Sequence, residues 1–340
     1  MWSSDSMLRV IYRFCVLTRK KKRICDDGPY SWWNSGNRRR WKCVVNARVW
    51  NLQVISRKGV NMEKSPEEIQ KLVKELKDWI MRQPHLPKDL DDKIIQRFLH
   101  SCFYDLDAAK NAMELFFRIR VTSPEIVNFR DPDSPQMQKA LKIVNMAQYQ
   151  ISKNRNIWIW QLNDPGLDNY DYLQDARLFF MTVDAWILSN EHYEDADIVV
   201  MDVKDITLKF ITKFNVSIAK KLSKFQEDAM PIRLKEVHIV NAPPFIDKLY
   251  GLMKPFLKPK MTELIHFHSP KSQTLYNYVS KEDLPEDYGG TRPSMNEQME
   301  KVVDTVMKYK KTFLHENFWK SEKKGKGVVE TTSFRALDID

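Results

Sequence analysis

The chain has 340 residues, of which 43% are hydrophobic, and its formal net charge is +10 at pH 7. This length and apolar content can supply a sizeable core in one large domain or two modest ones, which argues against a wholly disordered or fibrous chain. Because no stretch approaches the roughly 18 consecutive apolar residues that span a bilayer, we expect a soluble intracellular protein.

The basic charge is concentrated in residues 1–61, which hold 14 Lys and Arg against 3 acidic residues, whereas the remaining 41 basic and 42 acidic residues nearly balance. This segment also holds three of the 4 cysteines and half of the 10 tryptophans. It shows neither helical nor strand periodicity, so we predict a disordered basic extension outside the fold. Cys102 is the one cysteine beyond it, which excludes an internal disulfide in the body and fits a reducing compartment.

Two interpretations of residues 1–61 stay open. In the first, Met62 is the natural start, because helix-start signals follow it at once, and the upstream residues are a non-native extension. In the second, RKKKR at 19–23 and RRR at 38–40 form a functional basic arm that contacts phosphates. We favour the first interpretation, and therefore expect no nucleic-acid partner.

Residues 62–132 predict a small helical domain. Ser65 and Glu68 form a capping box before apolar residues at helical spacing, and Pro84 ends this first helix. A second helical pattern covers residues 94–99, and a third helix is predicted to be capped by Asp107.

Residues 133–291 alternate between strand and helix patterns. Ser134 and Pro135 open a helix, and helix patterns and β-rich runs then follow one another. The predicted strands are 157–162, 197–203, 236–241 and 264–268, and the predicted helices are 176–188, 215–225, 245–257 and 272–279. This alternation predicts an α/β domain with a mostly parallel sheet flanked by helices. Residues 292–340 predict one amphipathic helix, from about 295 to 316, and then a disordered polar tail.

Common catalytic signatures are missing from the body of the chain. It holds no GxGxxG turn, phosphate loop, GxSxG elbow, HExxH helix or paired CxxC motif, so we expect no enzyme activity, no cofactor and no metal. His266 and His268 alternate on a strand, as two metal ligands would, but packing or hydrogen bonding at a strand end explains them more simply. Cys102 is interpreted as a buried small hydrophobe.

Four segments resemble the CRAL-TRIO family in their order and spacing: LKEVHIVNAPP (234–244), FIDKLYGLMKPFL (245–257), LIHFHS (264–269) and LPEDYGG (284–290). RFLHSCFYDLDAAKNAM (97–113) is similar to the family's N-terminal helical signature, so the resemblance covers about residues 65–316. It is strongest to the branch of the alpha-tocopherol transfer protein and the cellular retinaldehyde-binding protein. The resemblance implies a lipid-filled α/β cavity closed by a mobile lid helix, without catalysis.

The resemblance also implies a phosphoinositide site. The basic residues that contact such head groups in this branch map onto Arg233, Lys235 and Lys260, whereas two further basic positions are Cys102 and Leu264 here, which weakens the site. In a second departure from the pattern, Asp205 stands where a strand-ending glycine is usual, which puts the geometry of that turn in doubt.

The segment 245–257 also predicts a lid from its residues alone. Its apolar stripe suits a membrane interface, although a core-packing helix would show the same pattern. Prolines before, within and after the segment favour a lid with defined hinges. The stripe consists of Phe245, Leu249, Leu252, Met253 and Phe256.

Nine apolar residues are candidate cavity walls, and the same side chains would equally suit a solid core. They are Phe179, Phe180, Val183, Ile187, Ile218, Leu222, Phe225, Val237 and Ile239. The expected function is binding of a hydrophobic small molecule, such as a tocopherol or retinoid, and its transfer between membranes by a monomeric cytoplasmic protein that touches membranes transiently. The alternative is a module that binds phosphoinositide or protein without transporting a lipid.

Overall fold

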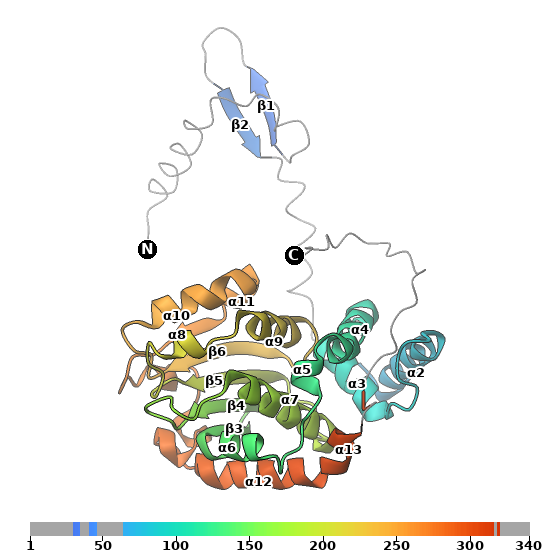
Figure 1. Cartoon of the computed structure of the whole chain (residues 1–340). Helices are drawn as coiled ribbons and strands as arrows, with labels where there is room; N and C mark the ends of the chain where they lie inside the picture. Colours follow the sequence, from blue (N-terminus) through green and yellow to red (C-terminus); the bar gives the residue numbers. More distant parts are fainter. Residues whose placement is uncertain (1–29, 35–40, 46–63, 316–317, 320–340) are drawn as a thin grey trace. The chain divides into compact units, whose positions relative to one another are not determined.

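A computed structural model describes residues 30–34, 41–45, 64–315 and 318–319. The chain divides into two compact units, Met1–Lys64 and Ser65–Asp340. In the first unit, β1 (Tyr30–Asn34) and β2 (Trp41–Val45) form an antiparallel pair (Figure 1). The prediction that residues 1–61 hold no regular element is therefore wrong at these strands. Their aromatic and β-branched residues were the signal, since a ribbon can form without alternation of apolar and polar residues. The rest of that prediction lies outside the described residues.

The second unit begins with a group of short helices. The capping box of Ser65 and Glu68 is confirmed at the start of α2. The predicted cap of the third helix was wrong, because Asp105 and not Asp107 accepts the backbone N–H groups of Asp107 and Ala108, at 3.0 and 2.9 Å. A left-handed turn at Phe103 and Tyr104 places Asp105 there. The helices are α2 (Pro66–Arg82), α3 (Asp92–Ser101), α4 (Leu106–Thr122) and α5 (Pro124–Val127).

A five-stranded sheet follows, in the order β3-β4-β5-β6-β7. β4 to β7 are parallel, as predicted, while β3 pairs antiparallel with β4. The sequence analysis missed β3, because it continues directly from helix α6 (Pro135–Ile143) and mixes polar with apolar residues. The strands are β3 (Val144–Ile151), β4 (Arg155–Leu162), β5 (Ala196–Asp202), β6 (Leu234–Val240) and β7 (Ile265–Phe267).

The later helices flank this sheet. Figure 1 shows α10 toward the β6 side and α12 along the β3 side. The helices predicted at 176–188 and 215–225 are confirmed, whereas 272–279 is wrong: it holds only a 3₁₀ turn, Thr274–Asn277, in which Leu275 is buried. The helices are α7 (Tyr172–Ser189), α8 (Phe210–Lys213), α9 (Val216–Asp228), α10 (Ile246–Met253), α11 (Pro259–Thr262), α12 (Met295–Lys308) and α13 (Lys310–Leu314). No described helix is long and apolar enough to cross a membrane.

The two faces of the sheet are covered differently. Ile198, Val200 and their neighbours on one face pack against the irregular segment 275–295. On the other face, Trp158 and Val199 pack with α4, α7 and α9, whereas Trp160 and Met201 pack with α6, α7, α10 and α12. The side chains alternate between these faces because successive residues of a strand point in opposite directions.

A buried ion cluster joins the N-terminal helices to α7. Asp184 of α7 accepts hydrogen bonds from Arg120 of α4 and, at 2.6 Å, from Arg130. Neither Arg120 nor Asp184 has exposed surface. Desolvation lowers the pKa of Arg120 to about 10. A buried ion pair of this kind is costly to break, because removal of one partner leaves a bare charge in the core.

Candidate functional site

A row of half-buried apolar residues crosses the helix-covered face of the sheet. Trp160, Met201 and Ile239 are register neighbours on β4, β5 and β6, and each retains exposed surface. β5 is the central strand, and on its opposite face Ile198 and Val200 are only 0% and 1% exposed. These three side chains pack against the core cluster that the sheet forms with α6, α7, α10 and α12. We call the region around these half-buried side chains the recess.

Helix α7 supplies the facing side of the recess. Most of its residues are buried, but Tyr172, Asp175 and Phe179, which share one helix face, are half-buried. The indole of Trp160 donates to the carboxylate of Asp175 at 3.1 Å, which places this helix face directly against the sheet row. The recess is therefore bounded by aromatic and aliphatic side chains with one carboxyl group among them.

The nine predicted cavity residues fall into two groups. Phe180, Val183, Ile187, Ile218, Phe225 and Val237 are buried, whereas Phe179, Leu222 and Ile239 are half-buried. The rings of Phe180 and Phe225 lie 4.5 Å apart between centroids, tilted by 36°, in a core cluster that includes α4 and α9. The first group thus contributes to solid packing, and the second retains surface for contact. A role for any of them in ligand binding stays a prediction.

Sequence reasoning missed four residues that bound the recess: Trp160, Tyr172, Asp175 and Met201. Strand parity would have found two of them, because Trp160 and Met201 lie on the same face as the predicted Ile239. Asp175 gave no such signal, since an acidic residue in the first turn of a helix is ordinarily explained by the helix dipole.

The predicted lid helix is shorter than expected. α10 ends at Met253 and a 3₁₀ turn covers Lys254–Phe256, because Pro255 has no N–H to continue the α-helix. Leu249 is buried, while the other four stripe residues, Phe245, Leu252, Met253 and Phe256, are half-buried. The segment 245–257, which we call the lid, thus rests on the body with few fully enclosed side chains.

Polar contacts hold both ends of the lid. Before it, Asn241 takes a left-handed conformation (φ 55°) and donates to the Asp202 carboxylate at 2.8 Å. After it, the backbone N–H of Lys258 donates to Glu227 at 3.2 Å, and its ammonium group pairs with Asp228. The lid is therefore attached through polar groups at its ends and through apolar groups along its length.

The turn after β5 removes one doubt that the sequence raised. The backbone N–H of Ile206 donates to the Val203 carbonyl at 3.0 Å, and no described non-glycine residue at 203–206 has a positive φ. Asp205 therefore replaces the usual glycine without backbone strain.

The three predicted phosphoinositide residues are not equally available. Arg233 donates from Nε to the His100 carbonyl at 2.8 Å, and its guanidinium lies 4.4 Å from the Phe103 ring. Lys235 and Lys260 are exposed, and Lys235 lies 3.6 Å from the carboxylate of Glu236. Arg233 is thus partly engaged in the fold, and the head-group site stays a prediction.

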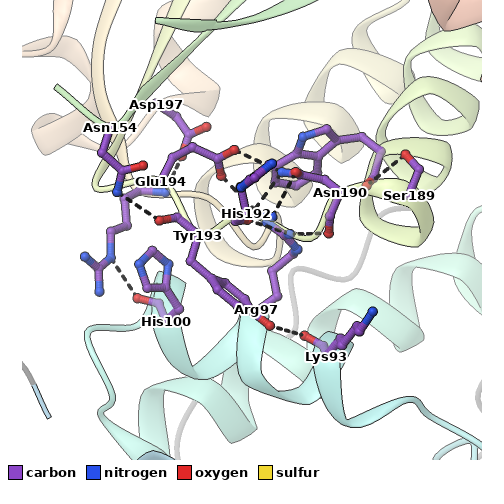
Figure 2. A network of polar contacts seen from close by, with 12 residues as sticks. Lys93, Arg97, His100, Asn154, Ser189, Asn190, His192, Tyr193, Glu194 and Asp197 are labelled. Atoms are coloured by element: carbon purple, nitrogen blue, oxygen red, sulfur yellow. Dashed lines mark hydrogen bonds and ion pairs between the residues drawn. The ribbon is translucent and has the colours of Figure 1, made fainter. Parts of the chain in front are cut away.

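A polar network beside Arg233 fixes α3 to the loop between α7 and β5 (Figure 2). Arg97 donates to the carbonyls of Asn190 and His192 at 2.7 and 2.9 Å, and it lies 4.3 Å from the ring of Trp186. The Tyr193 hydroxyl donates to the Lys93 carbonyl at 3.3 Å. These contacts attach α3 to the loop between α7 and β5.

The two predicted histidines belong to a larger cluster that includes His238. This cluster lies on the face of the sheet that the segment 275–295 covers, which we call the closed face. His238 Nδ1 and His268 Nε2 are 3.0 Å apart, and the His266 ring stacks on His238 at 5.2 Å. Burial lowers the pKa of His238 to about 4. Within the part of the chain that the structure describes, no group of three or more His, Cys, Asp or Glu is arranged to hold a metal. Packing and hydrogen bonding therefore account for these histidines.

Comparisons with known proteins match the two parts of the second unit. Residues 142–290 match the model of the CRAL/TRIO domain, and residues 65–137 match that of the Pinta-like UBA domain. The chain is 26% identical over 239 residues to a human protein named alpha-tocopherol transfer protein-like, covering 70% of each chain. It is 22% identical over 307 residues to human clavesin-2, covering 84% of this chain and 93% of that one.

Among solved structures, the chain is similar to the crystal structure of Sfh5, with a TM-score of 0.45 and 13% identity over 73% of this chain and 98% of that one. The two matched segments coincide with the mixed sheet and its flanking helices and with the helices that precede it. Residues 142–290 of the chain thus match the CRAL/TRIO domain, and the helices before them match the Pinta-like UBA domain.

Proposed function

We propose that this protein binds a hydrophobic small molecule in the recess and transfers it between membranes. The observation that carries the proposal is the half-buried row of Trp160, Met201 and Ile239, which lies under covering helices and not at a sheet edge. Apolar side chains held in this state gain stability when another apolar surface covers them. The name of the tocopherol transfer-like relative supports a lipid of tocopherol type.

Burial of about 400 Å² of apolar ligand would contribute on the order of 10 kcal/mol before the cost of association. That is sufficient for slow release without a covalent bond, so the mechanism needs no catalytic step. The protein would act as a monomer in the cytoplasm and visit membranes transiently.

The lid supplies the route in and out. Its half-buried stripe can exchange contacts with the body for contacts with lipid, because both environments are apolar. Lys248, Lys254 and Lys258 flank the stripe, and each basic residue near an anionic surface contributes on the order of 1 kcal/mol. Phosphoinositides, through Lys235, Lys260 and the partly engaged Arg233, would add to this attraction.

Transfer between vesicles tests the proposal. Leu252→Asp and Phe256→Asp place charges on the lid stripe without filling a fully buried site, so we expect transfer of a fluorescent tocopherol or retinoid to slow at least tenfold, since a charge resists entry into the membrane interface. Met307→Asp changes an exposed apolar residue of α12 and should leave transfer unchanged.

The proposal fails if the purified protein takes up neither a tocopherol nor a retinoid from organic extracts or vesicles. Stoichiometric uptake with a transfer rate that the lid variants do not change would contradict the lid. No lipid uptake together with binding to phosphoinositide vesicles would favour the alternative, a non-transporting head-group module.

A further inference from the structure

Three histidines lie together on the closed face of the sheet, at the strand that follows the lid. His238 of β6 and His266 of β7 are register neighbours, and His268 directly follows β7. His238 is 0% exposed and His268 is 4% exposed. The ring of Tyr278 lies 4.8 Å from that of His238 and 4.6 Å from that of His266. The three imidazoles are therefore crowded together, and two of them are cut off from water.

The hydrogen bonds of this cluster suit neutral imidazoles. His238 Nδ1 and His268 Nε2 are 3.0 Å apart, so one of these nitrogens carries a proton and the other accepts it. His268 Nδ1 lies 2.7 Å from the Thr274 hydroxyl, and His238 Nε2 lies 3.4 Å from the Glu236 carboxylate. When both rings are protonated, both facing nitrogens carry hydrogens, and the contact between them becomes repulsive. One carboxylate can offset only one of the two positive charges.

The surroundings of His238 favour its neutral form. The titratable groups that face it are Glu236 from its own strand, His266 and His268 from the chain at β7, and Tyr278, while β5 contributes apolar side chains. Burial, and then the charge of a neighbouring histidine, lowers the pKa of His238 to about 4 and also lowers that of His268. The closed arrangement is thus most stable above pH 6.5 and loses stability as the pH falls toward 4.

β7 connects the histidine cluster to the lid. It is a three-residue strand at the edge of the sheet, and among the described strands only β6 pairs with it. The His268 carbonyl accepts the backbone N–H of Ala242, just before the lid, at 2.9 Å. Phe267, on the opposite face of β7 from the histidines, has its ring 5.3 Å from that of Tyr250 on α10. A displacement of β7 would therefore loosen the lid at its start and along its length.

We infer that these histidines form a proton-sensitive switch: protonation of His238 and His268 separates their rings, displaces β7 and releases the lid. The inference rests on the proposed function and names the condition that opens the route for the lipid. An anionic membrane surface supplies this condition, because its potential of about −30 to −50 mV lowers the local pH by roughly half a unit to one unit. Exchange of the cargo is then favoured at anionic membranes and suppressed in the neutral solution between them.

Hydrogen exchange on the full chain tests the switch without any lipid. The protection factors of the lid amides, each corrected for the intrinsic exchange rate at its pH, should fall roughly thirtyfold from pH 7.5 to pH 5.0. That ratio is expected when a histidine whose pKa is about 4 regains a pKa of 6.5 on release. The amides of α12, which lies along the β3 side of the sheet, should change much less (Figure 1).

Glutamine variants remove the titration at one position each. In His238→Gln the fall in lid protection should be less than about threefold, because the ring that gains most on release is absent. His268→Gln should also reduce the fall, and it keeps the test open if the first variant folds poorly. His100→Gln is the matched control: burial lowers the pKa of His100 to about 4 as well, but its ring packs against Tyr104 and Tyr193. This variant should retain the full fall.

Three results would overturn the switch. They are equal lid protection at the two pH values, an equal fall in His238→Gln and the natural chain, and an equally large fall in α12, which would indicate global acid unfolding. Transfer of a fluorescent tocopherol between vesicles tests the proposed function separately. Transfer that proceeds at the same rate at both pH values would contradict the switch and leave the carrier standing. A pH-dependent lid in a protein that takes up no lipid would support the switch and contradict the carrier.

Discussion

The two faces of the same sheet differ in how completely they are covered. On β5, Ile198 and Val200 are enclosed by the segment 275–295, whereas Val199 and Met201, their immediate neighbours, remain half-buried under helices. Both faces are equally apolar at this strand. The difference therefore lies in the covering layer: an irregular segment with short turns covers one face, and α-helices cover the other.

The largest expected effect comes from shortening a side chain on the closed face. Ile198→Ala should reduce the free energy of unfolding by about 3 kcal/mol, because a cavity forms in a fully packed layer. Met201→Ala should cost about 1 kcal/mol, because its side chain is already partly accessible. Urea denaturation of the two variants measures both values. Equal losses would show that the two faces are packed alike.

The second prediction concerns acid stability. Burial lowers the pKa of His238 from 6.5 to about 4, so its contribution to stability is complete above pH 6.5 and is lost as the pH falls toward 4. The loss should be on the order of 3 kcal/mol, measured as the fall in unfolding free energy over that range. In His238→Gln the fall should be much smaller. An equal fall in unfolding free energy in that variant would exclude this histidine as the cause.

Asp175, on the helix α7 that covers the other face, should affect the pH dependence of stability in the opposite direction. Burial raises the pKa of Asp175 from 3.8 to about 6, so its contribution is complete below pH 3.8 and is lost as the pH rises through 6. The difference in unfolding free energy between Asp175→Asn and the natural chain should therefore favour the variant more at pH 8 than at pH 5. The same titration series measures this difference.

Enlarging side chains sharpens the comparison further. Ile239→Phe should fill part of the recess and lower lipid uptake with little loss of stability, because this residue is only half-buried. Val200→Phe, on the closed face, should cost about 1–3 kcal/mol through overpacking. Thermal unfolding and lipid uptake are measured on both variants. Full uptake by Ile239→Phe would place the cargo elsewhere.

The smallest effect is expected at the end of the lid. Lys258→Ala removes the pair with Asp228 while keeping the backbone contact to Glu227. An exposed ion pair is worth at most about 1 kcal/mol, so lipid transfer between neutral vesicles should accelerate by up to about fivefold at low salt and less at high salt. Lys301→Ala on α12 should change nothing. Slower transfer in Lys258→Ala would contradict a restraining role.

The sequence predicted those features that local chemistry determines. The capping box at Ser65, the strand and helix alternation and the family were readable because caps, periodicity and motif order are properties of short segments. β3 was missed because no break separates it from α6, and Asp107 was preferred over Asp105 because both fit a cap until the preceding turn is known. The recess was readable only in part, because packing density depends on the covering layer and not on the strand.

The buried cluster of Arg120, Arg130 and Asp184 bears on how the chain acquires its shape. Both cations precede the sheet in the chain, whereas their anion lies on α7. A fragment that begins at the sheet would keep a lone carboxylate in an apolar interior. We therefore expect removal of the N-terminal helices to destabilise the sheet domain that follows them.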